Sequence, residues 1–544
     1  MFYMQRDTHM THALSRRQVL KMLMSAGGAG LVSACGASSI VDTSGATDTS
    51  TRGTRRSAIV IGSGFGGSVA ALRLAQAGVD VTVLERGRAW PITDAGDTFC
   101  TSFVPDGRST WRRDKTVAPL GPQFDIESSL GVLDRQDYDG MEVYTGAGVG
   151  GGSLVYGCMT VEPNGALFNK VFEGQLSFDE MHERWYPLVR QMLGASPVPT
   201  DIFSEEFYDM SRQFEAIGNS VGIQSLHIDL ATDWDVVRAE MRGEAVESAI
   251  AGDLLYGGNS GYKQSLDRTY LPLAVATGNA VIQAQANVVG FERSPNGGWV
   301  VQVEDTDDHG AVNQARELEA DMLFVCAGST GTTEILLRAQ AAGVLTGLEQ
   351  TLGTRWGTNG NVMFMRSGLS VDTGKKQANP PVLAANYLDN PHTPIIVENA
   401  PFPIGIECNC LLQLAVSADI GRGRMELGSE SGSLQLDWPE DGTKSVVDAV
   451  MAFSDQMGTA DGGQMGGLFL PGPTETFTYH PLGGASMGSV CDDVGRVLGE
   501  PGLYVVDSAL IPGSVGCANP SLTIAAVAER ALEAIIKNDL SRVG

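Results

Sequence analysis

A glycine-rich turn near residue 60 has the residue types and spacing of a site for nucleotide phosphates. Residues 62–67 read G-S-G-F-G-G, and the short β-branched run 57–61 precedes them. Gly62 would permit a tight turn, Gly64 would let the backbone approach a pyrophosphate, and Gly67 would let the next helix pack closely. The phosphates would then lie at a helix N-terminus. An acid that ends the next apolar run is placed to bind a ribose. The predicted contacts are Gly62, Gly64, Phe65, Gly66, Gly67 and Glu85.

A second glycine cluster indicates that the dinucleotide is long. Residues 144–153 read Y-T-G-A-G-V-G-G-G-S, which is too long a run for a hairpin turn. Residues without Cβ let the backbone lie flat against a ligand. Strand-like runs at 321–326 and 502–507 end in further small residues. Binding segments scattered over the whole chain suit the extended FAD molecule better than a compact NAD unit.

His480 is the residue best suited to hold an alcohol and take its proton. Histidine has an unperturbed pKa near neutrality, so it is the natural acid or base at physiological pH. Of the seven histidines, His480 alone lies in an apolar turn flanked by glycines. A histidine buried only for packing is the alternative that the residues themselves leave open. Two of the other histidines lie near the N-terminus, and four lie in polar segments: His9 and His12, then His182, His227, His309 and His392.

Glu398 places one carboxylate at the end of the apolar run 395–397. Burial there would raise its pKa, which suits proton transfer at carbon. The alternative is an ordinary acid at the surface end of a strand.

These segments, taken with five others in order, resemble a flavoprotein family. The five further matching segments are G-Y-K-Q-S-L-D at 261–267, W-G-T-N-G-N at 356–361, Y-H-P-L-G-G at 479–484, I-P-G-S-V-G at 511–516, and Asn519-Pro520. It resembles the glucose–methanol–choline (GMC) flavoprotein oxidoreductases, and within them the bacterial cholesterol oxidases with non-covalent FAD. The resemblance extends over roughly residues 56–540.

The resemblance implies oxidation of a 3β-hydroxysteroid to the ketone by non-covalent FAD, with oxygen as acceptor and hydrogen peroxide as product. His480 matches the family's catalytic histidine, and Asn519 matches the partner that hydrogen-bonds the substrate oxygen. Glu398 aligns with the glutamate that moves a proton from C4 to C6 and so converts Δ5 to Δ4. The resemblance adds these FAD contacts: Gly151, Gly152, Gly157, Met159, Val288, Asp507 and Ser508.

Two departures from the family pattern keep other functions open. Tyr156 stands where the family has Asn, and Cys517-Ala518 adds one residue between Gly516 and Asn519. Both changes lie in segments expected beside the flavin, so the use of oxygen is in question. A flavin dehydrogenase that oxidises another alcohol and passes electrons to a quinone or cytochrome is one alternative. A non-catalytic, sterol-binding surface lipoprotein is the other.

The elements that position these residues predict an α/β fold with two interleaved domains. A discontinuous, Rossmann-like FAD-binding domain is expected over 56–165, 255–345 and 475–544. The substrate domain is expected over 166–254 and 346–474 as a mixed sheet covered by helices, with 364–407 lining an apolar steroid cavity. Within the first domain we expect strands at 57–61, 79–84, 321–326 and 502–507, and helices at 68–77 and 521–535.

Residues 1–34 resemble a twin-arginine export signal of a lipoprotein. Arg16 and Arg17 precede a weakly apolar run, and the segment 31–35 resembles a lipobox that ends in Cys35. Cys35 would carry the lipid, and the Ser/Thr/Gly-rich residues up to 55 would form a flexible tether. We therefore expect a periplasmic or cell-surface protein anchored to the membrane.

Composition excludes several classes of protein. The 544 residues carry a net charge of −27, which argues against a nucleic-acid partner because phosphate binding needs clustered Lys and Arg. No apolar run reaches the roughly 20 residues of a membrane span. The eight cysteines lack zinc-finger spacing, so no metal site is expected. Cys408 and Cys410 alternate on a predicted strand, which places them too close to bridge comfortably.

Overall fold

The computed structural model describes residues 55–117, 123–402, 404–418, 421–429, 431–467 and 470–540. The predicted export signal, Cys35 and most of the tether fall on residues 1–54, outside these ranges. Within the described part of the chain, no helix is both long enough and apolar enough to cross a membrane.

A five-stranded parallel sheet is built from segments far apart in the chain. Its order is β19 (Leu503–Val505), β10 (Met322–Val325), β1 (Ser57–Ile61), β2 (Asp80–Leu84) and β6 (Ala280–Gln283). The strands are nearly continuous apolar runs, as expected for a parallel sheet covered on both faces. Helix α2 (Phe65–Gln76) contacts α9 (Tyr270–Ala276) and α12 (Pro520–Ile535), while α10 (Gly328–Ala341) follows β10. The Rossmann-like α/β arrangement predicted from the sequence is confirmed.

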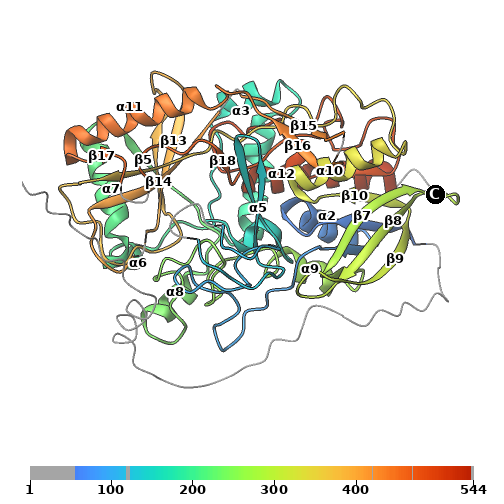
Figure 1. Cartoon of the computed structure of the whole chain (residues 1–544), viewed down its shortest axis with the longest axis horizontal. Coiled ribbons are helices and arrows are strands. Elements are labelled where there is room, and N and C mark those ends of the chain that lie inside the picture. Colours follow the sequence, from blue (N-terminus) through green and yellow to red (C-terminus); the bar gives the residue numbers. More distant parts are fainter. Residues whose placement is uncertain are drawn as a thin grey trace, which may run out of the picture. The chain divides into compact units, whose positions relative to one another are not determined.

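A six-stranded sheet lies apart from the parallel sheet, with β5, β13, β14 and β17 at the left of Figure 1 and β10 at the right. Its order is β17 (Gln464–Met465), β11 (Val362–Ser367), β14 (Cys410–Ser417), β13 (Ile395–Ala400), β12 (Leu383–Tyr387) and β5 (Gln224–His227). Every pairing is antiparallel, so the expected mixed sheet is corrected in this detail. Consecutive strands β12, β13 and β14 pair as neighbours, which requires antiparallel connections.

The two faces of this sheet have different surroundings. On one face, residues such as Val362, Val397 and Ala415 pack with α7 (Asp209–Ser220) and α11 (Lys444–Asp461). The alternation of a strand sends the intervening residues to the opposite face.

The remaining elements are short sheets and helices. A three-stranded sheet has the order β18 (Phe477–Thr478), β4 (Met141–Gly146), β3 (Leu133–Tyr138), and another has the order β7 (Ala286–Arg293), β8 (Trp299–Thr306), β9 (Val312–Ala320). Strands β15 (Arg424–Leu427) and β16 (Leu434–Asp437) pair with each other. The other α-helices are α3 (Gly165–Phe172), α4 (Phe178–Glu180), α5 (Tyr186–Met192), α6 (Thr200–Phe203) and α8 (Trp234–Met241).

Cys408 and Cys410 form a disulfide, which corrects the expectation that they lie too close to bridge. Asn409 between them has a left-handed backbone with φ of 47°, so the chain is not regularly extended at this point. The Cα atoms of the two cysteines are 5.4 Å apart, within the usual range for a disulfide. The other described cysteines are free and buried: Cys100, Cys158, Cys326, Cys491 and Cys517.

Candidate functional site

The turn between β1 and α2 is shaped by close backbone contacts and leaves one glycine facing open space. A Cβ on Gly67 would lie 2.0 Å from the carbonyl oxygen of Gly62, so only glycine fits there. A Cβ on Gly64 would meet no atom within 4 Å, although Gly64 caps the N-terminus of α2. The first turn of α2 holds no acidic residue. Its amide groups therefore suit an anion that approaches Gly64, as the FAD pyrophosphate would.

The second glycine segment lies directly against this turn. A Cβ on Gly151 would be 2.8 Å from the Cα of Gly64. The Ser63 hydroxyl donates to the Glu85 carboxylate at 2.6 Å and accepts from the Gly150 N–H at 3.1 Å. Gly152, like Gly64, faces open space. The two segments predicted to bind FAD thus meet, and each leaves a glycine beside unfilled space, which fits the cofactor.

Most of the other predicted FAD contacts lie where strands of the parallel sheet end or beside the second glycine segment, whereas Val288 lies in β7 of a separate three-stranded sheet. Glu85 accepts hydrogen bonds from Ser63 and from the Gly87 N–H, so part of its carboxylate is engaged within the protein. Asp507 accepts from the Gly328 N–H and the Thr332 hydroxyl, and so holds the start of α10. The partly accessible contacts are Gly62, Gly64, Phe65, Gly152, Gly157, Val288 and Ser508, whereas Gly66, Gly67, Glu85, Gly151, Met159 and Asp507 are buried.

Two hydrogen bonds of Asn361, one accepted and one donated, determine which nitrogen of His480 carries a hydrogen. The Tyr479 N–H donates to Asn361 Oδ1 at 3.0 Å, so the amide nitrogen is the atom that lies 2.9 Å from His480 Nδ1. Burial lowers the pKa of His480 to about 3, and the ring is therefore neutral at neutral pH. Because Nδ1 accepts from Asn361, the hydrogen of the ring is on Nε2. His480 can donate to an alcohol oxygen, but in this tautomer it cannot take the alcohol proton as we expected.

Asn359 anchors the loop that leads to Asn519. Its side-chain amide donates to the Ala518 carbonyl at 2.8 Å, and its oxygen accepts from the Val515 N–H at 3.1 Å. Asn519 caps α12 without using its side chain, since Pro520 is the first residue of the helix. The side chain is thus left free for the site. The segment 356–361 is part of the family resemblance, but we predicted no role for Asn359 or Asn361. The signal that could have identified them is a pair of asparagines around a glycine, directly before an apolar strand.

Glu398 is buried in β13 and contacts Asn519. It is 4% exposed, and burial raises its pKa to about 8, although a hydrogen bond from Asn519 acts in the opposite direction. Glu398 Oε1 and Asn519 Oδ1 are both buried and have no hydrogen-bond partner within the described residues. A buried acceptor without a donor is costly. These two oxygens therefore form a place where a hydroxyl group would be bound.

The residues around Glu398 form an apolar wall. Glu398 pairs in register with Leu414, which pairs with Met363. The next row along the sheet is Ala400, Leu412 and Met365. We call these residues, Met363, Met365, Ala400, Leu412 and Leu414, the apolar wall. They belong to the same cluster as Tyr479, the neighbour of His480. Glu398 and the histidine segment thus share one apolar environment.

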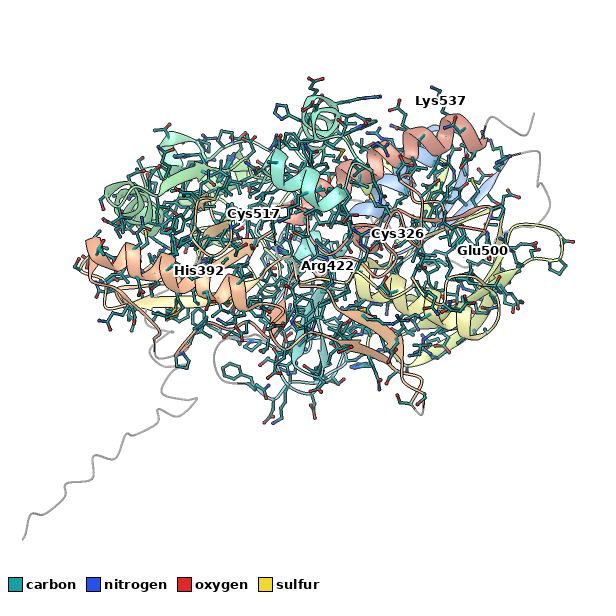
Figure 2. The ribbon with its side chains drawn as sticks, turned by 90° about the horizontal axis from the view of Figure 1, so that it is seen from above. Cys326, His392, Arg422, Glu500, Cys517 and Lys537 are labelled. Atoms are coloured by element: carbon teal, nitrogen blue, oxygen red, sulfur yellow. A yellow bond between two sulfur atoms is a disulfide. The ribbon has the colours of Figure 1, made fainter. Side chains whose placement is uncertain are left out.

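The other described histidines lie away from these groups. His182, His227, His309 and His392 are exposed, and His227 contacts the Glu215 carboxylate. Cys517 is buried near the site, with its thiol 3.6 Å from the Val416 carbonyl (Figure 2). Among the described residues, no group of three or more His, Cys, Asp or Glu could hold a metal ion.

Two family models match the chain. Residues 359–469 match "GMC oxidoreductase, C-terminal", and residues 60–89 match "NAD(P)-binding Rossmann-like domain". The first match contains Asn359, Asn361 and Glu398.

Relatives match over most of the chain. A cholesterol oxidase of Mycobacterium tuberculosis is 27% identical and covers 87% of this chain and 90% of its own length. A cholesterol oxidase of Acinetobacter baumannii is 24% identical over 88% and 94%.

Two solved structures have the same fold. A pyridoxine 4-oxidase from Mesorbium loti superposes with a TM-score of 0.61 at 15% identity, over 88% of this chain and 99% of that one. A fungal aryl-alcohol oxidase gives 0.60 at 15% identity, over 90% and 100%.

Proposed function

On the premise that this chain is an FAD-binding oxidoreductase of the GMC type, we propose that it oxidises the 3β-hydroxyl of a sterol to a ketone. Oxygen would accept the electrons and give hydrogen peroxide, and the ring double bond would then move from Δ5 to Δ4. The observation that carries the proposal is the pair of buried, unpartnered oxygens of Glu398 and Asn519 beside the apolar wall. The relatives named cholesterol oxidase support the choice of a sterol.

Three side chains would bind the alcohol, accept its proton and hold the proton acceptor in place. His480 Nε2–H donates to the hydroxyl oxygen and orients the carbon that loses hydride. The Glu398 carboxylate would accept the hydroxyl proton and release it to the reduction of oxygen, which consumes one proton for each hydrogen peroxide formed. The free carboxylate would then move a proton from C4 to C6 of the ketone. Asn519 holds the Glu398 carboxyl and contributes a second oxygen toward the substrate. FAD, held by the segments 62–67 and 150–152, supplies the hydride acceptor when bound.

A dehydrogenase for another alcohol, with a quinone or cytochrome as acceptor, is the second candidate. Tyr156 favours it, because this residue replaces the family's Asn and its ring meets Phe65 edge to face, with centroids 5.7 Å apart. Phe65 belongs to the turn that would contact FAD. An added aromatic pair at this position changes what can approach the cofactor.

Anaerobic flavin reduction tests the proposed function. Cholesterol should bleach the flavin absorbance of the purified holoenzyme faster than small or aromatic alcohols, and oxygen should then restore it with release of peroxide. The variant His480→Ala should slow bleaching by about 10²-fold or more, the usual contribution of an orienting acid–base group. The matched control is His227→Ala, which removes an exposed histidine.

Each outcome selects one function. Bleaching by cholesterol that is reoxidised by a quinone or dye, but not by oxygen, would select the dehydrogenase. A flavin that no alcohol bleaches would overturn the enzyme assignment, and an unchanged rate in His480→Ala would overturn the role of His480.

A further inference from the structure

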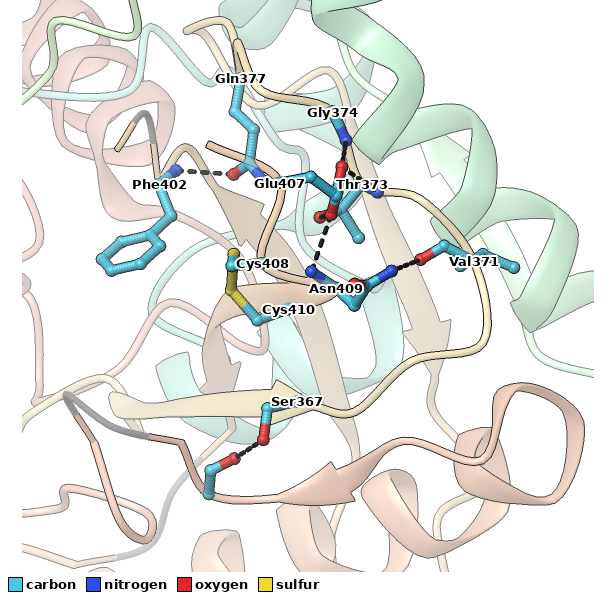
Figure 3. The surroundings of a disulfide bond; sticks show 11 residues. Ser367, Val371, Thr373, Gly374, Gln377, Phe402, Glu407, Cys408, Asn409 and Cys410 are labelled. Carbon is cyan, nitrogen blue, oxygen red and sulfur yellow. Dashed lines mark hydrogen bonds between the residues drawn. A yellow bond between two sulfur atoms is a disulfide. The ribbon is translucent and has the colours of Figure 1, made fainter. Parts of the chain in front are cut away.

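Gln377 is a fully buried amide with one end unused. It is 0% exposed, and its oxygen Oε1 accepts from the Phe402 N–H at 2.7 Å (Figure 3). Because a backbone N–H can only donate, this bond assigns the oxygen to the Phe402 side and turns the nitrogen Nε2 away. Nε2 is buried and has no hydrogen-bond partner within the described residues. A buried donor without an acceptor is costly, which indicates that an oxygen atom from outside the chain completes the pair.

Phe402 places this amide at the end of the apolar wall that is remote from Glu398. Phe402 lies four residues after Glu398, and the Cα atoms of two such residues are at most about 14 Å apart in a fully extended chain. It packs against the same cluster as Met365 of the wall. Ala400, halfway between Glu398 and Phe402, shares the face of Glu398 because side chains alternate along a strand. The wall therefore runs from Glu398 toward Phe402, and Gln377 lies where it ends.

The chain that follows Gln377 leads back to the predicted FAD contacts. The next residue, Ala378, is held by a hydrogen bond from its N–H to the Phe207 carbonyl at 2.9 Å. Three residues further on, the Cδ atom of Pro381 lies 3.4 Å from the position that a Cβ on Gly157 would take. Gly157 is one of the residues predicted to contact FAD. This stretch of chain therefore joins the cofactor end of the substrate region to the remote end, where Gln377 lies.

The two ends of the apolar wall have opposite hydrogen-bonding chemistry. Glu398 and Asn519 present oxygens without donors, which suit a hydroxyl group. Gln377 presents a nitrogen without an acceptor, which suits a carbonyl oxygen. Because an amide carries no charge, it suits a neutral carbonyl better than a carboxylate, whose burial requires a cation. The matching ligand has an apolar body with a hydroxyl group at one end and a carbonyl group at the other.

We infer that Gln377 binds a second oxygen atom of the substrate, and that the preferred substrates are 3β-hydroxysteroids with a carbonyl group at C17. This inference rests on the proposed function for the steroid and its 3β-hydroxyl. C3 and C17 lie at opposite ends of the rigid four-ring nucleus, so one molecule presents both oxygens without an ordering cost of its own. Cholesterol carries an alkyl chain at C17 and would leave Gln377 Nε2 without an acceptor.

A matched pair of steroids tests the role of Gln377 in the holoenzyme. 3β-Hydroxyandrost-5-en-17-one and androst-5-en-3β-ol differ only in the carbonyl group at C17. The value of kcat/KM should be about tenfold higher for the 17-ketone, the effect of one hydrogen bond to an otherwise unpaired group. Gln377→Met keeps the length of the side chain but removes the donor, so the ratio should fall to about one. Gln413→Met is the control, because Gln413 pairs with Phe364 on the opposite face of the sheet and the ratio should persist.

Titration calorimetry of the wild-type holoenzyme tests the same contact without turnover and without a variant that has to fold. Androst-4-ene-3,17-dione should bind about tenfold more tightly than androst-4-en-3-one. Equal affinities for the two ketones would overturn the inference, as would equal kcat/KM for the two alcohols or an unchanged ratio in Gln377→Met. If neither alcohol reduces the flavin, the proposed function fails, while the calorimetric comparison still decides whether Gln377 binds the C17 oxygen.

Discussion

Burial acts in opposite directions on the two titratable side chains of the proposed site. It raises the pKa of Glu398 to about 8 and lowers that of His480 to about 3, because each charged form loses hydration. Both groups are therefore mainly neutral at pH 7. Of these two groups, only Glu398 changes its charge between pH 5 and 9. Burial also lowers the pKa of Lys263 to about 8, so a variant of Glu398 is needed to assign a pH dependence to this carboxyl.

The variant Glu398→Gln should remove that pH dependence. In the wild-type enzyme the rate of flavin reduction should rise as pH passes through about 8, because the carboxylate is the form that accepts a proton. Glu398→Gln should be slower by about 10²-fold and flat with pH. Its steroid product should remain unconjugated, as measured by the ultraviolet absorbance of the enone. The exposed Glu426→Gln should behave as wild type. A variant that retains the rise near pH 8 would exclude Glu398 as the base.

At the residue scale, the sequence indicated the reacting groups better than the groups that hold them. Glu398 and His480 stand out because a titratable residue in an apolar run is unusual. In the structure Glu398 pairs with Leu414 of the apolar wall, and His480 follows Tyr479, which belongs to the same cluster as this wall. Asn359 and Asn361 were missed, since their roles depend on backbone groups more than 100 residues away in the chain. The donor role of His480 likewise follows from a single hydrogen bond that sequence patterns do not show.

At the scale of elements, the turn between β1 and α2 separates glycines needed for folding from a glycine needed for the cofactor. Gly67→Ala should prevent correct folding, because its Cβ would lie 2.0 Å from a backbone oxygen. Gly64→Ala should fold normally, since Gly64 has an ordinary φ of −71° and its Cβ meets no protein atom. It should nevertheless lose most of its FAD, because the methyl group would occupy the space of the pyrophosphate.

Flavin content and thermal unfolding distinguish these two effects. For Gly64→Ala we expect a low flavin absorbance per protein but an apoprotein Tm equal to that of the wild-type apoprotein. Full flavin content in Gly64→Ala would contradict the placement of the pyrophosphate.

The elements of the FAD-binding part were predicted closely and those of the second sheet were not. The strand at 57–61 is β1, and α12 begins one residue before the predicted 521. Helix α2 begins at Phe65, three residues earlier than expected, because the glycines Gly66 and Gly67 are helical. For the second sheet we predicted no strand bounds, and apolar runs do not show which strands pair, so its antiparallel order could not be read from the sequence. The proposed domain boundaries stay a prediction.

At the scale of the whole molecule, one buried ion pair joins helices from the beginning, middle and end of the described chain. Arg73 of α2 binds Glu529 of α12 at 2.6 Å, and the Tyr270 hydroxyl of α9 donates to the same carboxylate at 3.0 Å. Glu529→Ala should destabilise the protein by about 3 kcal/mol, because it leaves a partly buried guanidinium without a partner. Glu533→Ala changes another residue of α12 and breaks an exposed ion pair with Arg184, so it should cost less than about 1 kcal/mol. Urea unfolding of the two variants compares these costs, and equal midpoints would contradict the prediction.

The order of strands in the parallel sheet has a consequence for synthesis of the protein. Strand β19 lies at one edge of the sheet beside β10, and the helix that follows it presents Asn519. A nascent chain therefore makes its glycine turn at residues 62–67 early, but the sheet that supports this turn is incomplete until residues 503–505 leave the ribosome. FAD would bind after translation rather than during it. Until then, β10 exposes an unpaired apolar edge that chaperones would have to shield.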